Sequence, residues 1–252
     1  LPNALRYVLY RARERYAEGA STERIKESVA SAVGDFIESS LIAVKKIGEI
    51  GAGRIVDDDV ILTHCNSQAA IAILRHAHRG GKSISVFVSE TRPRYQGRYT
   101  AEVLSKDGIP VSLIVDSAAR YFMPKVDKVV IGADAVAANG AVVNKVGTSM
   151  IALAAHETRV NVMVGAETYK FSPRTFLGEL IEIEERPTQE VAPAEWLSKN
   201  PGVSIRNPAF DVTPPEYIDS IVTEAGVVSP HSILFLVKDR FGWAYGKEEP
   251  WA

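Results

Sequence analysis

The sequence contains only one cysteine, Cys65, among 252 residues, so the chain cannot form an internal disulfide. It also lacks any apolar run near the roughly 18 residues that a membrane-spanning helix requires. Its first residues do not follow the charged-then-apolar pattern of a secretory signal. We therefore expect a cytoplasmic protein with a reduced thiol and no membrane partner.

No excess of either charge is present, because the formal net charge is only -2. This balance provides no general attraction for nucleic acid, so no DNA partner is expected. Glycine-rich phosphate-binding motifs are missing as well: the chain has neither G-x-G-x-x-G after the first predicted strand nor a Walker A sequence. The histidines do not stand at metal-ligand spacing, since His76 and His78 face different sides of a predicted helix. We expect neither a metal nor another cofactor.

What the sequence does contain is typical of a folded globular protein, with 46% apolar and 24% charged residues. Apolar residues recur at helical spacing over residues 3–46, and Ser21 is the expected start of the second of two helices. Glycines within residues 48–53 interrupt that pattern. We predict a helical N-terminal segment over residues 1–50 and an α/β domain over residues 51–252.

Short continuous apolar runs alternate with helical stretches in the rest of the chain. Parallel strands covered on both faces have such runs, so we predict a doubly wound, Rossmann-like parallel sheet. Right-handed connections bring the C-terminal ends of its strands to one edge, where ligands of open α/β sheets bind. The predicted strands cover residues 60–62, 84–88, 111–115, 128–131 and 160–164, with a further strand at 180–184 and an apolar helix or strand at 233–237.

Cys65 directly follows the first predicted strand, and residues 66–70 are the expected opening turn of a helix. A thiol beside a helix N-terminus has its thiolate stabilised by exposed N–H groups, which makes it a base or nucleophile near neutral pH. Free cysteine is also among the most frequently buried residue types. The position alone therefore leaves two interpretations, a reactive thiol or an inert core residue.

An arginine-rich loop follows the second predicted strand and contains Arg92, Arg94 and Arg98, with Gln96 among them. The planar guanidinium group suits bidentate recognition of phosphate. Arginines are also common on loops that bind nothing. The loop is thus either a phosphate clamp or a solvated basic segment.

Asp134 ends the fourth predicted strand among apolar neighbours. A carboxylate in such surroundings tends to have a raised pKa, which suits a proton donor, while an ordinary loop aspartate or turn cap is the other interpretation. Asn139 and Gly140 then predict a hairpin. The hairpin leads to Asn144 and Lys145, which either hold an anionic group or are exposed polar residues.

Five motifs occur in order along nearly the whole chain. They are Thr-His-Cys-Asn-Ser at 63–67, Glu-Thr-Arg-Pro with Gln-Gly-Arg within 90–98, Gly-Ala-Asp with Ala-Asn-Gly within 132–140, Asn-Lys-Val-Gly-Thr at 144–148 and Asn-Pro-Ala-Phe-Asp-Val-Thr-Pro-Pro at 207–215. Together these motifs resemble one superfamily. It contains the alpha, beta and delta subunits of translation initiation factor 2B, methylthioribose-1-phosphate isomerase and archaeal ribose-1,5-bisphosphate isomerase.

Within this superfamily the resemblance to the isomerases is the stronger one. They carry a cysteine at the position of Cys65 and an aspartate at that of Asp134, whereas the translation-factor subunits generally lack the cysteine. Methylthioribose-1-phosphate isomerases typically read Cys-Asn-Thr-Gly, where this chain has Ser67 and Gln68. The difference favours conversion of ribose 1,5-bisphosphate to ribulose 1,5-bisphosphate in nucleoside monophosphate degradation. Methylthioribose-1-phosphate isomerase and a non-catalytic initiation factor 2B-like regulatory subunit are the alternatives.

The resemblance also implies roles for individual residues. Asp134 is expected to protonate the ring oxygen of the sugar, and the Cys65 thiolate to remove the proton from C2. Asn144 and Lys145 are expected to hold sugar hydroxyls or a developing oxyanion, and Lys170 a phosphate. The remaining expected substrate-binding residues are Asn66, Ser67, Gln68, Ala69, Arg92, Gln96 and Arg98.

Two further family properties bear on the chain. Members self-associate through the α/β domain, which implies a homo-oligomer, either a dimer or an assembly of dimers. Members also carry an Arg-Gly motif and another arginine upstream of the part that matches residues 1–7, and both help to bind phosphate. The sequence does not include that part.

Overall fold

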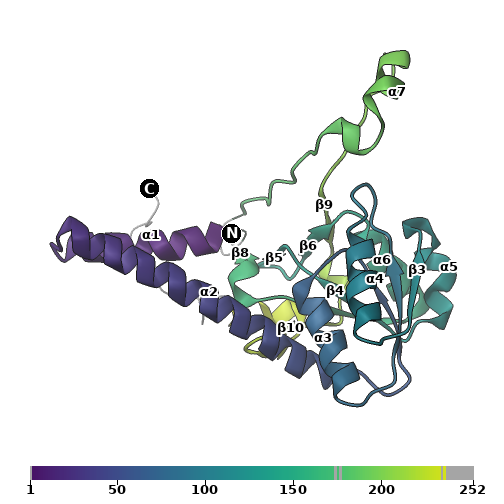
Figure 1. Ribbon diagram of the computed structural model, residues 1–252, viewed down its shortest axis with the longest axis horizontal. Helices are drawn as coiled ribbons and strands as arrows, with labels where there is room; N and C mark the ends of the chain where they lie inside the picture. The colour runs from purple at the N-terminus through teal and green to yellow at the C-terminus, as the bar shows by residue number, and fades with distance from the viewer. Residues whose placement is uncertain (1, 173–174, 176–177, 234, 237–252) are drawn as a thin grey trace.

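The computed structural model describes residues 2–172, 175, 178–233 and 235–236. A long helical hairpin extends from one side of an α/β body, and an arm of chain extends from another (Figure 1). No helix among these described residues has an apolar stretch sufficient to span a bilayer. The helices are α1 (Pro2–Ala17), α2 (Thr22–Ala52), α3 (Gln68–Arg79), α4 (Gln96–Lys106), α5 (Ala119–Phe122), α6 (Thr148–Thr158) and α7 (Ala194–Lys199). The strands are β1 (Val60–Thr63), β2 (Ser85–Ser89), β3 (Val111–Ile114), β4 (Lys128–Gly132), β5 (Ala135–Ala137), β6 (Val142–Lys145), β7 (Asn161–Gly165), β8 (Phe171–Ser172), β9 (Phe210–Thr213), β10 (Ser220–Thr223) and β11 (Gly226–Val228).

Helices α1 and α2 form the helical N-terminal segment. Ser21 caps α2 as expected, because its side chain accepts a hydrogen bond from the backbone N–H of Arg24. The helix does not end at the first glycine, however, and continues to Ala52. A Cβ atom on Gly51 would lie 2.5 Å from the side chain of Ile73 in α3. Gly48 and Gly51, which were expected to interrupt the helix, instead allow α2 and α3 to pack closely, whereas Gly53 is the C-cap of α2.

The main sheet has seven strands in the order β11-β10-β7-β4-β1-β2-β3. All neighbours pair in parallel except β10 and β11, which are antiparallel. The first five predicted strands are present as β1, β2, β3, β4 and β7, and the predicted fold class is confirmed. The strand order reverses between β1 and β4. Ligands of open α/β sheets bind at such a switch point.

Apolar layers cover both faces of this sheet. Along β4, Val130 faces the layer formed with α2, α3 and α4, whereas Val129 and Ile131 face the layer formed with α5 and α6. All three side chains are fully buried. Burial of a Val or Ile side chain contributes about 1.5–3 kcal/mol. The two apolar layers therefore hold the central strands, and with them the polar residues that follow the strands.

A small second sheet lies beside the C-terminal edge of the main one, with the order β8-β5-β6-β9. Strands β5 and β6 form the predicted hairpin, in which the N–H of Gly140 donates to the carbonyl oxygen of Ala137 at 2.9 Å. The φ of Gly140 is 87°, a value that glycine adopts readily. This sheet positions Asp134 immediately before β5 and Lys145 at the end of β6.

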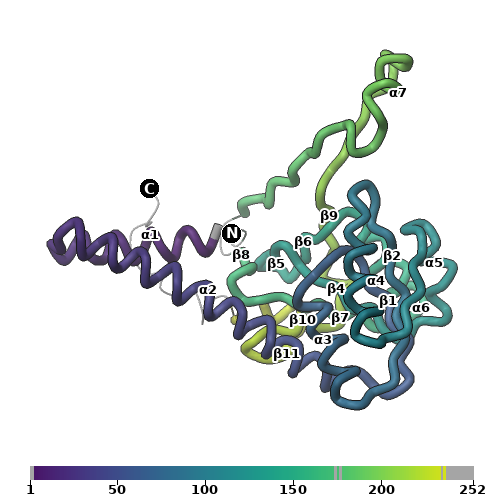
Figure 2. The backbone as a smooth tube through the Cα atoms, viewed as in Figure 1, coloured from purple at the N-terminus to yellow at the C-terminus, as the bar shows by residue number. Residues whose placement is uncertain are grey.

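The chain between β8 and β9 forms an arm that runs out to α7 and returns (Figure 2). The strand predicted over residues 180–184 is not formed, and Leu180 is 94% exposed. An isolated β-bridge between Glu185 and Pro208 joins the two sides of the arm near its base. The apolar element predicted at 233–237 is helical at its three described positions, and its other two residues lie outside the described residues.

Gly97→Ala will destabilise the protein, because α4 packs directly on the end of β2 at this residue. A Cβ atom on Gly97 would lie 1.8 Å from the carbonyl oxygen of Ser89. We expect the free energy of unfolding in denaturant to fall by roughly 3 kcal/mol. Gly34→Ala is the matched control, since nothing lies within 4 Å of its new methyl group, and it should raise stability by up to about 1 kcal/mol. Equal stability of the two variants would contradict this packing argument.

Candidate active site

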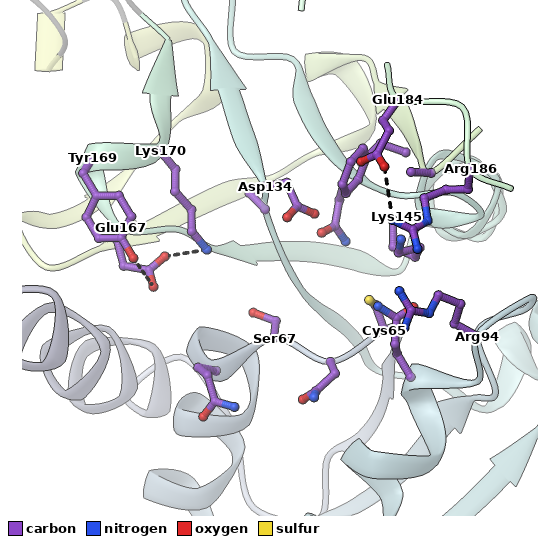
Figure 3. A pocket seen from close by; sticks show the side chains of 17 residues that line it. Cys65, Ser67, Arg94, Asp134, Lys145, Glu167, Tyr169, Lys170, Glu184 and Arg186 are labelled. Carbon is purple, nitrogen blue, oxygen red and sulfur yellow. Dashed lines mark hydrogen bonds and ion pairs between the residues drawn. The ribbon is translucent and has the colours of Figure 1, made fainter. Parts of the chain in front are cut away.

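A cavity of about 490 Å³ lies at the C-terminal ends of β1 and β4, where the strand order reverses. Its volume suits a small metabolite. Figure 3 shows the loop after β1, with Cys65 and Ser67, on one side and the second sheet, with Asp134 and Lys145, on the other. The cavity is therefore formed by segments that are far apart in the sequence.

The structure brings most of the predicted site residues to this cavity. Ala69 is instead buried within α3, and neither Arg92 nor Arg98 lines the cavity. Arg92 donates from Nη1 to Oη of Tyr95 at 2.7 Å, and the Arg98 guanidinium lies 3.8 Å from the centroid of the same ring. The predicted residues that do line the cavity are Cys65, Asn66, Ser67, Gln68, Gln96, Asp134, Asn144, Lys145 and Lys170.

Other residues that line the cavity were not predicted. Arg94 is the loop arginine that reaches it, while the Tyr95 ring holds both neighbouring arginines outside. Glu184 and Arg186 come from the arm, and no periodic pattern could mark them because the arm has little regular structure. The rest follow strands or lie within the quoted motifs, which was an available signal: Ala133, Glu167, Tyr169, Ala209 and Phe210.

Cys65 lies directly after β1, and its side chain is buried. Burial raises the pKa of its thiol, Asp134 adds to this effect, and the N–H of Asn66 and the ammonium of Lys145 oppose it. The expected lowering by a helix N-terminus does not dominate, because α3 begins only at Gln68 and desolvation outweighs the favourable groups. The free protein therefore holds Cys65 mainly as a thiol near neutral pH.

Asp134 follows β4 and lines the cavity, but the residue stays exposed to solvent. Partial desolvation by the surrounding protein raises the pKa of its carboxyl group, Lys170 and Lys145 lower it, and Glu167 raises it further. The raised pKa agrees with the expectation for a carboxylate at an apolar sheet edge. A carboxyl group of this kind keeps its proton to a higher pH than usual and can act as a proton donor.

The charge of Lys145 acts on both of these groups and lowers the pKa of Cys65 as well as that of Asp134. Its side chain is buried, and Nζ lies 4.8 Å from the centroid of the Phe210 ring. Nδ2 of Asn144 donates to Oγ1 of Thr148 at 2.9 Å, and that hydroxyl donates to the Lys145 carbonyl at 2.6 Å. These bonds fix the end of β6, so the ammonium is held where negative charge can develop.

Positive side chains occupy both ends of the cavity, with Lys170 at one end and Arg94 and Arg186 at the other (Figure 3). Oε1 of Glu190 lies 2.7 Å from Nη2 of Arg186 and 3.9 Å from Nε of Arg94, so this carboxylate keeps the two guanidinium groups near each other. Lys170 is held by Glu167, whose Oε2 lies 2.8 Å from its Nζ. The cavity suits a ligand with an anionic group at each end.

An acid, a thiol and an ammonium thus line one cavity. Such a set can move protons on a bound anionic ligand. Across residues 2–172, 175, 178–233 and 235–236, no group of three or more His, Cys, Asp or Glu side chains is placed to hold a metal ion.

The rate of alkylation of Cys65 will report the charge beside it, because the chain has no other cysteine. Lys145→Met removes an ammonium that stabilises the thiolate. The pKa of the thiol then rises further, and iodoacetamide should react roughly ten-fold more slowly near neutral pH for each unit of that rise. Lys170→Met is the matched control, since its charge acts on Asp134 and not on Cys65. Equal slowing by the two variants would contradict the assignment of Lys145.

The chain was compared with known proteins by family and by sequence. The initiation factor 2 subunit family matches residues 1–230. A ribose 1,5-bisphosphate isomerase from Pyrococcus furiosus is 54% identical over 252 residues, which are 100% of this chain and 78% of that protein. A methylthioribose-1-phosphate isomerase from Geobacter metallireducens is 42% identical over 223 residues, covering 84% of this chain and 64% of that protein.

Solved structures show the same likeness. The crystal structure of the translation initiation factor eIF-2B, subunit delta, from A. fulgidus superposes with a TM-score of 0.74 at 34% identity. The superposition covers 91% of this chain and 70% of that one. The family matches residues 1–230, and the Pyrococcus furiosus relative is 54% identical over the whole of this chain. The chain therefore belongs to the initiation factor 2 subunit family, as its five motifs indicated.

Proposed function

We propose that this chain is a sugar-phosphate isomerase that converts ribose 1,5-bisphosphate to ribulose 1,5-bisphosphate. The observation that carries the proposal is the arrangement of the cavity, in which Cys65 and Asp134 lie between cationic groups at two opposite ends. A five-carbon sugar with a phosphate at each end matches that arrangement. The full-length similarity to a relative of that name supports the same substrate.

In the proposed reaction the Cys65 thiolate removes the proton from C2 of the cyclic sugar. The electrons of that bond form a double bond between C1 and C2, and the bond between C1 and the ring oxygen breaks. Asp134 protonates the ring oxygen as it leaves, so the ring opens to an enol phosphate. A proton then returns to C1 and the C2 hydroxyl loses its proton, which gives the ketone. Atoms and electrons balance without a co-reactant.

The raised pKa values of the two groups suit these roles. Asp134 keeps its proton to a higher pH than an ordinary aspartate and so can donate it to the ring oxygen. Cys65 is a stronger base once ionised because its thiol has a high pKa, and the Lys145 ammonium stabilises the thiolate. The same ammonium is available to stabilise the oxyanion that develops at C2.

The bisphosphate fits the cavity better than methylthioribose 1-phosphate does. Arg94 and Arg186 form the end opposite Lys170. Paired guanidinium groups suit a second phosphate, whereas an apolar methylthio group could form no charge-assisted hydrogen bond with them. A non-catalytic regulatory subunit is the remaining alternative, and it does not account for a thiol and a carboxyl group that share one cavity and both have a raised pKa.

We further propose that the protein is cytoplasmic, acts in nucleoside monophosphate degradation and is a homo-oligomer, either a dimer or an assembly of dimers. Apolar side chains that a monomer leaves in water support self-association through the α/β domain. Leu113 and Val115, at the edge strand β3, are 48% and 53% exposed.

The purified protein should convert ribose 1,5-bisphosphate to a ketose phosphate, followed by NMR. Cys65→Ser and Asp134→Asn should each lower kcat roughly 1,000-fold, because each removes a proton-transfer group. Asp107→Asn is the control, since Asp107 pairs with Arg75 outside the cavity and its loss should leave kcat near the parent value. Faster turnover of methylthioribose 1-phosphate would contradict the substrate, and turnover of neither sugar would contradict the enzyme proposal.

Arg94→Met combined with Arg186→Met should raise KM for ribose 1,5-bisphosphate roughly 10–100-fold, because a phosphate loses charge-assisted hydrogen bonds. KM for ribose 1-phosphate, which lacks the second phosphate, should change much less. Arg206→Met is the matched control, because this arm arginine pairs with Glu185 and does not line the cavity. An equal change in KM for both sugars would refute a phosphate at this end.

A further inference from the structure

Cys65 adopts a left-handed backbone conformation, with a φ of 68°. Residues other than glycine adopt this conformation at a cost in free energy, and it persists only where the surroundings over-determine it. Glycine would adopt this conformation without strain, but it has no thiol. Because position 65 is a cysteine, other groups must hold its backbone in this conformation.

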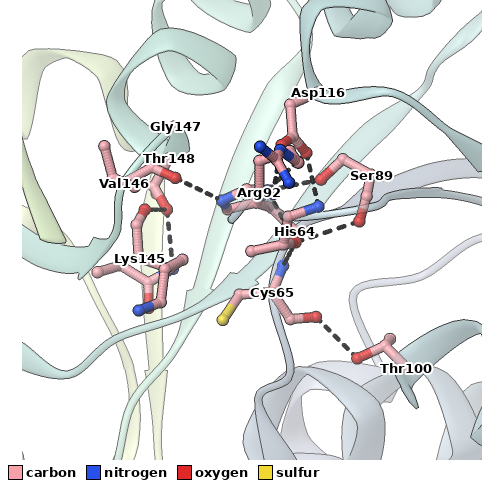
Figure 4. A network of polar contacts seen from close by, with 12 residues as sticks. His64, Cys65, Ser89, Arg92, Thr100, Asp116, Lys145, Val146, Gly147 and Thr148 are labelled. Atoms are coloured by element: carbon pink, nitrogen blue, oxygen red, sulfur yellow. Dashed lines mark hydrogen bonds and ion pairs between the residues drawn. The ribbon is translucent and has the colours of Figure 1, made fainter. Parts of the chain in front are cut away.

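Two buried threonine hydroxyls hold the peptide groups on both sides of Cys65. The N–H of Cys65 donates to Oγ1 of Thr91 at 2.9 Å. Oγ1 of Thr100, in α4, donates to the carbonyl oxygen of Cys65 at 2.7 Å (Figure 4). Thr91 is 0% and Thr100 is 1% exposed, so water does not compete for either bond. The two bonds fix the peptide planes that define the conformation of Cys65.

Thr91 is itself held from the next strand of the sheet. Its own φ is 63°, and its N–H donates to Oδ1 of Asp116 at 2.7 Å. The neighbouring N–H of Arg92 donates to Oδ2 of Asp116, also at 2.7 Å. Cys65, Thr91 and Asp116 follow β1, β2 and β3, which are adjacent in the sheet. A row of hydrogen bonds thus ties the three strand ends together.

His64 has a separate role, although it precedes Cys65 directly. Nε2 lies 3.0 Å from the carbonyl oxygen of Val146, and Nδ1 lies 2.5 Å from Oγ of Ser89 (Figure 4). Burial lowers the pKa of His64, so the ring is neutral, donates to Val146 and accepts from Ser89. Both ring nitrogens are occupied, and His64 does not line the cavity. It anchors β1 to the turn before α6 and is not the base that activates Cys65.

We propose that Thr91 and Thr100, braced by Asp116, are positioning residues that hold Cys65 in its left-handed conformation and so aim its thiol into the cavity beside Lys145. Neither threonine lines the cavity, so each acts through Cys65 and not on the ligand. The expected loss of turnover in variants of these threonines rests on the proposed function, in which the thiol removes a proton. The expected change in the position of the thiol relative to Lys145 does not depend on that function.

The test uses Thr91→Val and Thr100→Val, singly and together. Valine removes the hydroxyl and keeps the shape of the side chain, and the matching serine variants keep the hydroxyl. The first readout is the factor by which Lys145→Met slows the alkylation of Cys65. This factor is measured in the parent protein and in each threonine variant. This factor should approach one in the valine variants, because the thiol no longer faces the ammonium, and should return to the parent value in the serine variants.

The second readout is turnover of ribose 1,5-bisphosphate. In the valine variants kcat should fall roughly 10–100-fold with little change in KM, because the contacts that bind the substrate remain while the base is misaligned. Serine at either position should restore kcat. Thr158→Val is the control, since it removes a hydroxyl that only donates to backbone carbonyls of α6, and neither readout should change.

Valine variants that keep the full Lys145 effect and the full kcat would overturn the proposal, as would serine variants that restore neither. If the double variant does not fold, the single Thr100→Val variant decides by the same two readouts. If the parent protein turns over neither sugar phosphate, the proposed function is lost. The alkylation readout then still decides whether the threonines position the thiol.

Discussion

The parallel pairing of β1 with β4 is the constraint on which the site depends. The two strands are far apart in the chain, yet Ile61 pairs with Lys128 and Leu62 with Val129. Beyond β1 the sheet continues with β2, and beyond β4 it continues with β7. The connections that follow β1 and β4 therefore run in opposite directions, which leaves a crevice at the C-terminal ends of the two strands. Cys65 follows one strand and Asp134 the other, so the pairing brings the thiol and the carboxyl group to the same crevice.

Burial of this crevice has a chemical consequence as well as a structural one. Desolvation is the largest influence on the pKa of both Cys65, which is buried, and Asp134, which stays partly in contact with solvent. Lys145 and Lys170 moderate that influence with charges that are themselves held by β6 and by Glu167. Cys65 and Asp134 therefore ionise less readily than they would in water, although the nearby ammonium groups favour their ionised forms.

The sequence predicted the elements whose signal is local. Continuous Val and Ile runs marked five parallel strands, and Asn139 with Gly140 marked the hairpin, because burial on both faces and tight turns each demand particular residue types at short spacing. The prediction for the arm was wrong: its apolar residues indicated a strand over 180–184, but none of these residues is in a strand and Leu180 is 94% exposed. Gly51 was read as a break in α2, although it permits contact with Ile73 across to another helix.

The sequence by itself determined the fold class, the family and the set of polar residues that follow the strands, since each depends on residue type and order along the chain. Only the tertiary structure decided that Arg94 rather than Arg92 or Arg98 reaches the cavity, because the Tyr95 ring retains the other two. It also decided the state of Cys65. Burial raises the pKa of the thiol, whereas the sequence position alone had left a reactive thiol and an inert core residue both open. Hydroxyls from two other segments hold its backbone. Desolvation and long-range hydrogen bonds depend on which distant segments meet, and that information is absent from local sequence patterns.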